Sequence, residues 1–133
     1  MSGDILKKVK VDLIIFSLGA CGYGLIELLW RGHTHWSMLT AGGLSFCGLS
    51  IIAEKFRNVG IFLKAIFGGI LITAVELSFG VIFNILFKKN VWDYSKMPLN
   101  LGGQICALYS FFWVVLSFFA IPLASALNKK LSK

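Results

Sequence analysis

The stretch IFLKAIFGGILITAVELSFGVIFNILF, residues 61–87, decides the fold class. It carries two charged side chains, Lys64 near its start and Glu76 near its middle. A helix needs about 20 mostly apolar residues to cross the hydrocarbon core of a bilayer. Because this stretch is longer than that, it predicts a transmembrane helix that is tilted or extends into the interface.

Three further apolar stretches accompany it, at about residues 11–30, 38–53 and 101–127. Charged or polar segments separate all four. The chain is 57% hydrophobic and 14% charged, whereas a soluble domain has about 25% charged residues. Too little polar surface is available to coat a soluble domain. The sequence therefore predicts an all-α integral membrane protein, one domain with four transmembrane helices.

The basic residues predict how the chain is oriented in the cell membrane. Nine of them lie at the two ends and in the middle region that joins the second and third stretches, including the first turn of the third: Lys7, Lys8, Lys10, Lys55, Arg57, Lys64, Lys129, Lys130 and Lys133. Four lie in the other two connections: Arg31, Lys88, Lys89 and Lys96. Cytoplasmic loops are enriched in lysine and arginine, so both termini are expected in the cytoplasm. The short lysine groups between apolar runs favour membrane lipids as partners and argue against nucleic acid.

The two halves of the chain keep the same order of features. Gly19 precedes Glu27 by eight residues, and Gly68 precedes Glu76 by the same interval. Tryptophan, serine and methionine then lead to glycine pairs at 42–43 and 102–103. This order predicts two similar helical hairpins related by an axis along the membrane normal. Chance similarity between apolar hairpins is the alternative.

Ionisable groups inside the spans are candidates for function. Such groups are costly in lipid and usually face the interior of the helix bundle. Glu27 and Arg31 stand four residues apart, a spacing typical of an ion pair. Glu76 has no basic residue one helical turn away, so it is either part of a pathway or an inter-helix hydrogen-bonding group. Its predicted helix face also carries Gly69, Thr73, Gly80 and Asn84.

The connections between the spans hold the remaining polar chemistry. His33 and His35 are weak metal candidates because an H-x-H pair alone is a weak signal, so solvated or loop-capping histidines, with no metal and no cofactor, are expected. The segment LNLGGQ, residues 99–104, is typical of a glycine-rich helix start or a short re-entrant turn.

Three cysteines, Cys21, Cys47 and Cys106, lie in or beside apolar runs and are expected to be small packing residues. A lipoprotein signal ending at Cys21 is disfavoured because the apolar run continues beyond it.

Three pieces of the sequence carry a family resemblance: GYGLIELLWRGHTHWSMLTAGG (22–43), ITAVELSFGVIFN (72–84) and VWDYSKMPLNLGGQICALYSFFW (91–113). Over about residues 19–113 the chain resembles the bacterial family named "putative type IV ABC-transporter permease", and four-helix transmembrane proteins of animals are similar too. The resemblance implies a permease component. It marks these positions as the ones that matter: Glu27, Arg31, Gly32, Trp36, Ser37, Glu76, Asn84, Trp92, Asp93, Tyr94, Ser95, Asn100 and Gln104.

The favoured function is a membrane transport component, or a small-solute transporter or channel, with Glu76 beside the pathway. Four helices enclose little space, so a homodimer or a partner membrane subunit is expected. One alternative is a non-transporting interaction, chaperone or lipid-binding subunit. A membrane-embedded enzyme that uses His33, His35, Asp93 or the glutamates ranks last, and no enzymatic activity is expected, because no recognisable nucleophile or metal motif is present.

Overall fold

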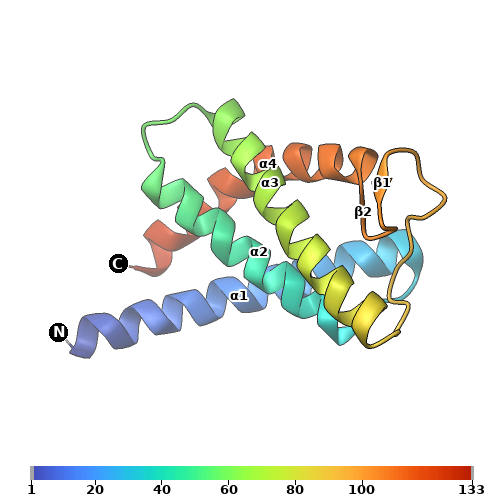
Figure 1. Ribbon diagram of the computed structural model, residues 1–133. Helices are drawn as coiled ribbons and strands as arrows, with labels where there is room; N and C mark the ends of the chain where they lie inside the picture. Colours follow the sequence, from blue (N-terminus) through green and yellow to red (C-terminus); the bar gives the residue numbers. More distant parts are fainter. Residues whose placement is uncertain (1, 133) are drawn as a thin grey trace.

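The computed structural model describes residues 2–132, with the side chain of Ser2 left aside. Four long helices make up most of this part of the chain (Figure 1): α1 (Ser2–Arg31), α2 (Trp36–Lys55), α3 (Ile61–Phe79) and α4 (Ala107–Leu131). A π-helical segment, Gly80–Leu86, continues α3. Each of the four is long and apolar enough to cross a membrane. The predicted all-α class is confirmed, and the protein is a multi-pass membrane protein.

Two helix boundaries differ from the expected spans. Helix α1 begins at Ser2 rather than near residue 11, because hydropathy marks the part of a helix in lipid, whereas lysine-rich turns also form helix. Helix α4 begins at Ala107 rather than near residue 101. The residues before it form a small antiparallel hairpin of β1 (Asn100–Leu101) and β2 (Ile105–Cys106).

The helices pack as two hairpins, α1 against α2 and α3 against α4, and α2 also contacts α3 and α4. The core lies where α2, α3 and α4 meet, around Leu49, Ile72 and Ile121. At the α1–α2 crossing, a Cβ atom on Gly19 would lie 2.9 Å from the carbonyl oxygen of Gly42. Glycine therefore permits this close approach of the two backbones.

The two glycines that the predicted repeat aligns both lie at helix contacts. Gly19 packs on α2, and its counterpart Gly68 packs on α4, where an added Cβ would lie 2.7 Å from Cβ of Ser117. The glycine pairs, however, differ in place. Residues 42–43 lie within α2, whereas residues 102–103 form the turn of the β-hairpin with φ angles of 60° and 75°.

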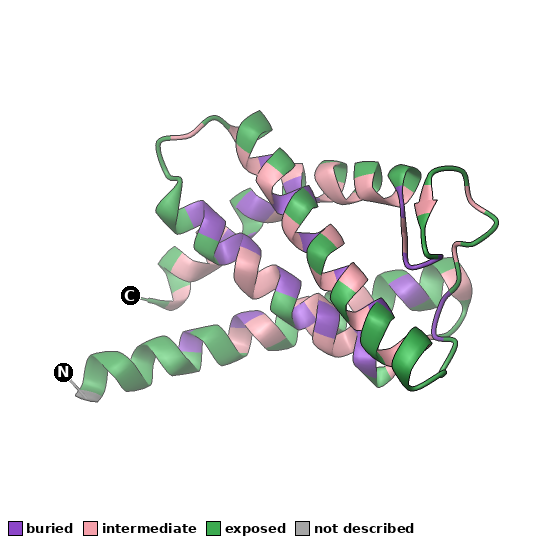
Figure 2. Cartoon of the chain, viewed as in Figure 1, coloured by how far each residue is buried: buried purple, intermediate pink, exposed green. Residues whose placement is uncertain are grey.

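Most of the outward surface is apolar, as lipid requires. Figure 2 shows exposed residues along much of α1 and buried residues where the helices cross. Leu29 is 80% exposed and Phe62 is 76% exposed, which an apolar solvent tolerates at no cost.

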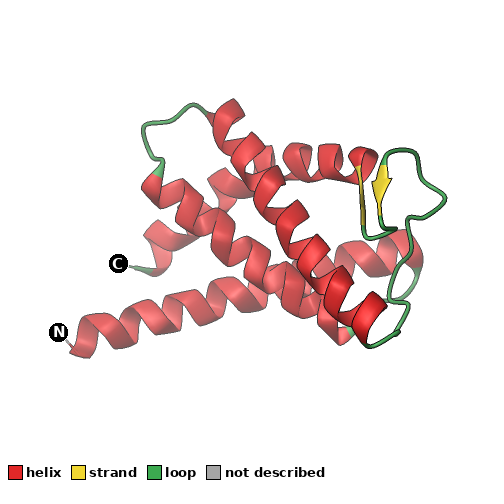
Figure 3. Cartoon of the chain, in the orientation of Figure 1, coloured by secondary structure: helices red, strands yellow, loops and turns green. Residues whose placement is uncertain are grey.

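The bundle has two distinct ends. Figure 1 shows the N-terminal end of α1, the α2–α3 turn and the C-terminal end of α4 at one end, and the connections 32–35 and 87–106 at the other. Figure 3 shows that the longer loop and its hairpin sit at this second end. The basic residues that were grouped from the sequence fall at these same two ends, apart from Lys133, which lies outside the described residues.

Candidate functional site

Glu76 lies at the centre of the site. It stands on α3, and only 5% of its surface is exposed. The hydroxyl of Tyr94, in the long loop, donates a hydrogen bond to its Oε2 at 2.9 Å. The indole Nε1 of Trp113, on α4, donates to its Oε1 at 3.2 Å. One carboxylate therefore connects α3, the loop and α4 through two neutral donors.

Beside Glu76 is a cavity of about 450 Å³ that is lined by all four long helices. Most of its lining is aliphatic or glycine, for example Leu18 and Ile26 from α1 and Leu123 from α4. Among the lining residues in the described part of the chain, Glu76 is the one carboxylic acid, and none has a basic side chain. The site thus pairs one carboxyl group with a large apolar space.

Two aromatic side chains stand at the polar end of this cavity. Tyr23, on α1, and Trp113 both line it, and their ring centroids are 5.9 Å apart with the planes tilted by 56°. Neither was named as a site residue from the sequence. Trp113 offers a signal in hindsight, because a buried indole N–H in the middle of an apolar span needs a hydrogen-bond acceptor.

Glu27 is neutralised within the chain. It is 6% exposed, and its Oε2 lies 2.7 Å from Nε of Arg31. The four-residue spacing predicts this ion pair, and the structure contains it. Arg31 also donates through Nη1 to the backbone carbonyl of Val91 at 3.2 Å. The pair therefore fastens the end of α1 to the start of the long loop.

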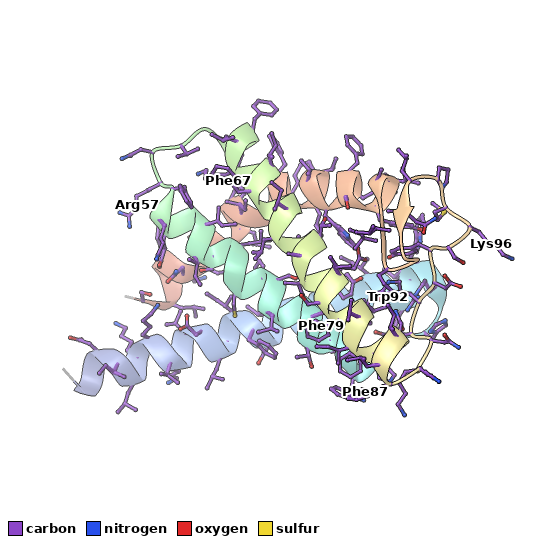
Figure 4. The ribbon with its side chains drawn as sticks, in the orientation of Figure 1. Arg57, Phe67, Phe79, Phe87, Trp92 and Lys96 are labelled. Carbon is purple, nitrogen blue, oxygen red and sulfur yellow. The ribbon has the colours of Figure 1, made fainter. Side chains whose placement is uncertain are left out.

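An amide pair fastens the long loop to α3. Nδ2 of Asn84, in the π-helical segment, donates to Oε1 of Gln104 at 2.9 Å. Oδ1 of Asn84 accepts from the backbone nitrogen of Val91 at 2.7 Å. The indole of Trp92 donates to the carbonyl of Gln104 at 2.9 Å. Figure 4 places Trp92 at the same end of α3 as Phe79 and Phe87, and Trp92 packs in a cluster with Phe79.

Tyr94 reaches inward from the same loop. Its ring stacks on that of Tyr109, with centroids 4.9 Å apart and planes 13° apart. Burial, and then the nearby carboxylate of Glu76, raise the pKa of Tyr94 above its ordinary value. The hydroxyl therefore stays protonated and donates its hydrogen bond to Glu76 throughout the physiological pH range.

The tip of the loop is shaped by its own polar groups. Oδ1 of the exposed Asp93 accepts from the backbone nitrogen of Ser95 at 2.8 Å, and this bond lowers the pKa of Asp93 below its ordinary value. Nδ2 of Asn100 donates to the carbonyl of Met97 at 2.8 Å. These residues order the loop and do not line the cavity.

The short α1–α2 connection has a local role in the fold. Nδ1 of His35 accepts from the backbone nitrogen of Ser37 at 3.2 Å and caps α2. Gly32 adopts a φ of 80° just after α1 ends. His33 and Trp36 are exposed. Within residues 3–132, no three histidine, cysteine, aspartate or glutamate side chains gather in a way that could hold a metal ion.

The structure thus brings most of the candidate residues to one end of the bundle, around Glu76 and the loop that reaches it. Gly80 joins them, because a Cβ there would lie 2.6 Å from Oε1 of Gln104. No sequence pattern identifies this contact, since it depends on how a loop folds back on α3.

Comparison with known proteins gives one kind of match. Neither the curated proteins nor the solved structures contain a sequence that matches the chain. The model of the family described as "Putative ABC-transporter type IV" matches residues 14–133, nearly the whole chain. The match includes Glu27, Glu76 and the long loop, together with all four predicted spans except the first few residues. The chain therefore belongs to this family.

Proposed function

We propose that this protein is a membrane transport component that binds a largely apolar or amphipathic molecule between its four helices, with Glu76 at the polar end of the site. The cavity is the observation that carries the proposal. Its volume of about 450 Å³ falls within the range of about 300–1,000 Å³ that is usual for small-molecule sites. The cavity opens between helices whose outward surfaces are apolar and therefore suited to contact with lipid.

The lining of the cavity indicates the kind of solute. Its side chains with polar atoms are Tyr23, Ser45, Glu76 and Trp113, and the others are apolar. A hydrated ion would lose its water shell here without a ring of oxygen ligands to replace it. A molecule with an apolar body loses little, because burial removes its apolar surface from water. The lining therefore favours an organic solute over an inorganic ion.

The long loop supplies a means of control in this proposal. Tyr94 binds Glu76 directly, and Asn84 and Gln104 fix the loop against α3. A solute that takes the place of the Tyr94 hydroxyl on Glu76 would release the loop on that side. Binding in the cavity and the position of the loop would then depend on each other.

Transport in this proposal involves a second copy of the chain or a partner membrane subunit, and both termini face the cytoplasm. Four helices leave one face of the cavity to be closed by another surface. No enzymatic step is part of the proposal.

Occupancy of the cavity tests the proposal. Gly22 lines the cavity, and a Cβ added to it meets no atom within 4 Å. Gly22→Trp should therefore fill the space without moving the backbone. Leu29→Trp, at a position that is 80% exposed, is the matched control. Native mass spectrometry should show a retained molecule on the wild type and on Leu29→Trp, and its loss from Gly22→Trp. Equal occupancy in all three proteins would contradict the proposal.

A structural subunit without transport activity is the second candidate. The observation in its favour is that both oxygens of Glu76 already accept hydrogen bonds from Tyr94 and Trp113. On this alternative Glu76 only joins α3 to the loop and α4. Such a subunit would carry no molecule in the cavity, and Gly22→Trp would leave its mass spectrum unchanged apart from the mass of the substitution.

A further inference from the structure

The carboxyl group of Glu76 lacks a basic partner. Within residues 3–132, two ion pairs form, Lys8 with Asp12 and Arg31 with Glu27. Glu76 is in neither, and both of its hydrogen bonds come from uncharged donors. A buried carboxylate that is hydrogen-bonded but has no counter-charge is incompletely compensated. A cation that enters the cavity would supply what the chain does not.

The groups around Glu76 are those that receive an organic cation. The ring of Trp113 is held beside the carboxyl group by its own hydrogen bond to Oε1. The ring of Tyr23 packs against that of Trp113, with the centroids 5.9 Å apart, and also lines the cavity. Aromatic faces attract cations, and they do so more strongly when water is excluded. The remaining lining, such as Leu116 and Leu123, suits an apolar body.

From this arrangement we infer that the solute is a lipophilic cation: a quaternary ammonium or phosphonium, or a protonated amine, carried on an apolar body. Its positive group binds at the carboxylate of Glu76, beside the rings of Tyr23 and Trp113. Its apolar part lies along the α1 and α4 side of the cavity. This inference rests on the proposed function and names the class of solute that the same cavity takes.

A zwitterionic lipid headgroup fits this site less well. Its phosphate would enter together with its ammonium group and would need a cation of its own. Arg31, which lies at the end of α1, is already paired with Glu27, with 2.7 Å between its Nε and Oε2 of Glu27. The charge of the site therefore complements a molecule with a net positive charge and no phosphate.

Equilibrium dialysis with radiolabelled tetraphenylphosphonium tests the inference. The purified full chain in detergent should bind it at one saturable site per chain. Radiolabelled tetraphenylborate, which has nearly the same shape and the opposite charge, should not bind when it is dialysed on its own. Glu76→Gln should weaken binding by about tenfold or more, because a buried charge pair is lost. The glutamine keeps an oxygen for Trp113 and an N–H for Tyr94. Asp12→Asn, which removes an exposed acid outside the cavity, should bind like the wild type.

A second pair of variants keeps the test decisive if Glu76→Gln fails to fold. Tyr23→Phe keeps the aromatic face and should bind within about twofold of the wild type, whereas Tyr23→Leu should weaken binding by about three- to tenfold. Absence of binding to the wild type, equal binding by Glu76→Gln, or binding of tetraphenylborate at the same site would overturn the inference. If native mass spectrometry then shows a neutral or zwitterionic molecule that Gly22→Trp excludes, the proposed function stands while the cationic class falls.

Discussion

Glu76 joins three parts of the molecule through one side chain. Its two oxygens accept hydrogen bonds from the long loop and from α4, and it stands on α3. Ionisable groups inside a membrane are expensive and usually serve a function. Glutamine keeps an oxygen that accepts from Trp113, and its N–H can donate to the hydroxyl oxygen of Tyr94, so substitution at this position separates the charge of Glu76 from its part in the fold.

Tyr94→Phe should destabilise the protein. The change leaves Oε2 of a side chain that is 5% exposed without its donor, and an unsatisfied buried polar atom costs about 1–3 kcal/mol. The free energy of unfolding, measured by denaturant titration in micelles, should fall by this amount.

Tyr109→Phe is the matched control for that measurement. Tyr109 stacks on Tyr94, but its hydroxyl has no hydrogen-bond partner within residues 3–132. It should therefore change the free energy of unfolding by less than about 0.5 kcal/mol, as substitutions away from buried contacts do. Equal decreases in the free energy of unfolding of both variants would show that the hydrogen bond from Tyr94 to Glu76 does not stabilise the protein.

Asp93 gives the loop a dependence on pH. Its hydrogen bond from the Ser95 backbone lowers its pKa below the ordinary value of 3.8. An aspartate with a lowered pKa in the folded state stabilises that state at pH values above its ordinary pKa, and this contribution is lost as the pH falls through the lowered value. The amide proton of Ser95, followed by NMR in micelles, should keep its hydrogen-bonded chemical shift down to pH 3.8. The chemical shift should change only at lower pH. A midpoint at or above pH 3.8 would contradict this.

The π-helical end of α3 determines which residues face the loop. A π-helical turn holds one residue more than an α-helical turn and often marks a functional site. Here it directs Asn84 to Gln104 and to the backbone of Val91. Gly80, its first residue, lies where the side chain of Gln104 packs most closely.

Gly80→Ala should therefore disturb the loop. The new methyl group would lie 2.6 Å from Oε1 of Gln104, and overpacking of this kind costs about 1–3 kcal/mol. Gly22→Ala, where a Cβ meets open space, should instead stabilise α1 by up to about 1 kcal/mol through helix propensity. Thermal unfolding of the two variants checks this. A melting temperature for Gly80→Ala at or above that of Gly22→Ala would exclude the close contact.

At the level of elements, the sequence predicts those features of the fold that depend on a local pattern of residues. Hydropathy and helical spacing are local properties, so they placed four spans and the stripe around Glu76. The structure packs the first part of that stripe on α4, where Thr73 donates to Ser110 at 3.0 Å, and its last part, Gly80 and Asn84, on the long loop. The hairpin at residues 100–106 and the contact between Glu76 and Trp113 depend on residues far apart in the chain. No periodicity encodes such contacts, so the sequence left the LNLGGQ segment with two interpretations, and Trp113 was missed.

The whole molecule presents two ends with different charge. Figure 4 shows Arg57 and Lys96 at opposite ends of the bundle. The positive-inside rule then places Arg57 in the cytoplasm and Lys96 outside. Single cysteines at these positions, in a chain whose own cysteines are replaced, should differ in labelling by an impermeant maleimide in intact cells. Lys96→Cys should be labelled at once and Arg57→Cys only after permeabilisation. The reverse pattern would invert the proposed orientation.

The account as a whole requires that the charge of Glu76 acts in the movement of a solute. The most direct test is the flux of the molecule retained by the purified protein, measured in proteoliposomes containing wild type, Glu76→Gln or Asp12→Asn. We predict flux by the wild type and Asp12→Asn, and its loss in Glu76→Gln with unchanged thermal stability. Flux by Glu76→Gln equal to that of the wild type would contradict the account.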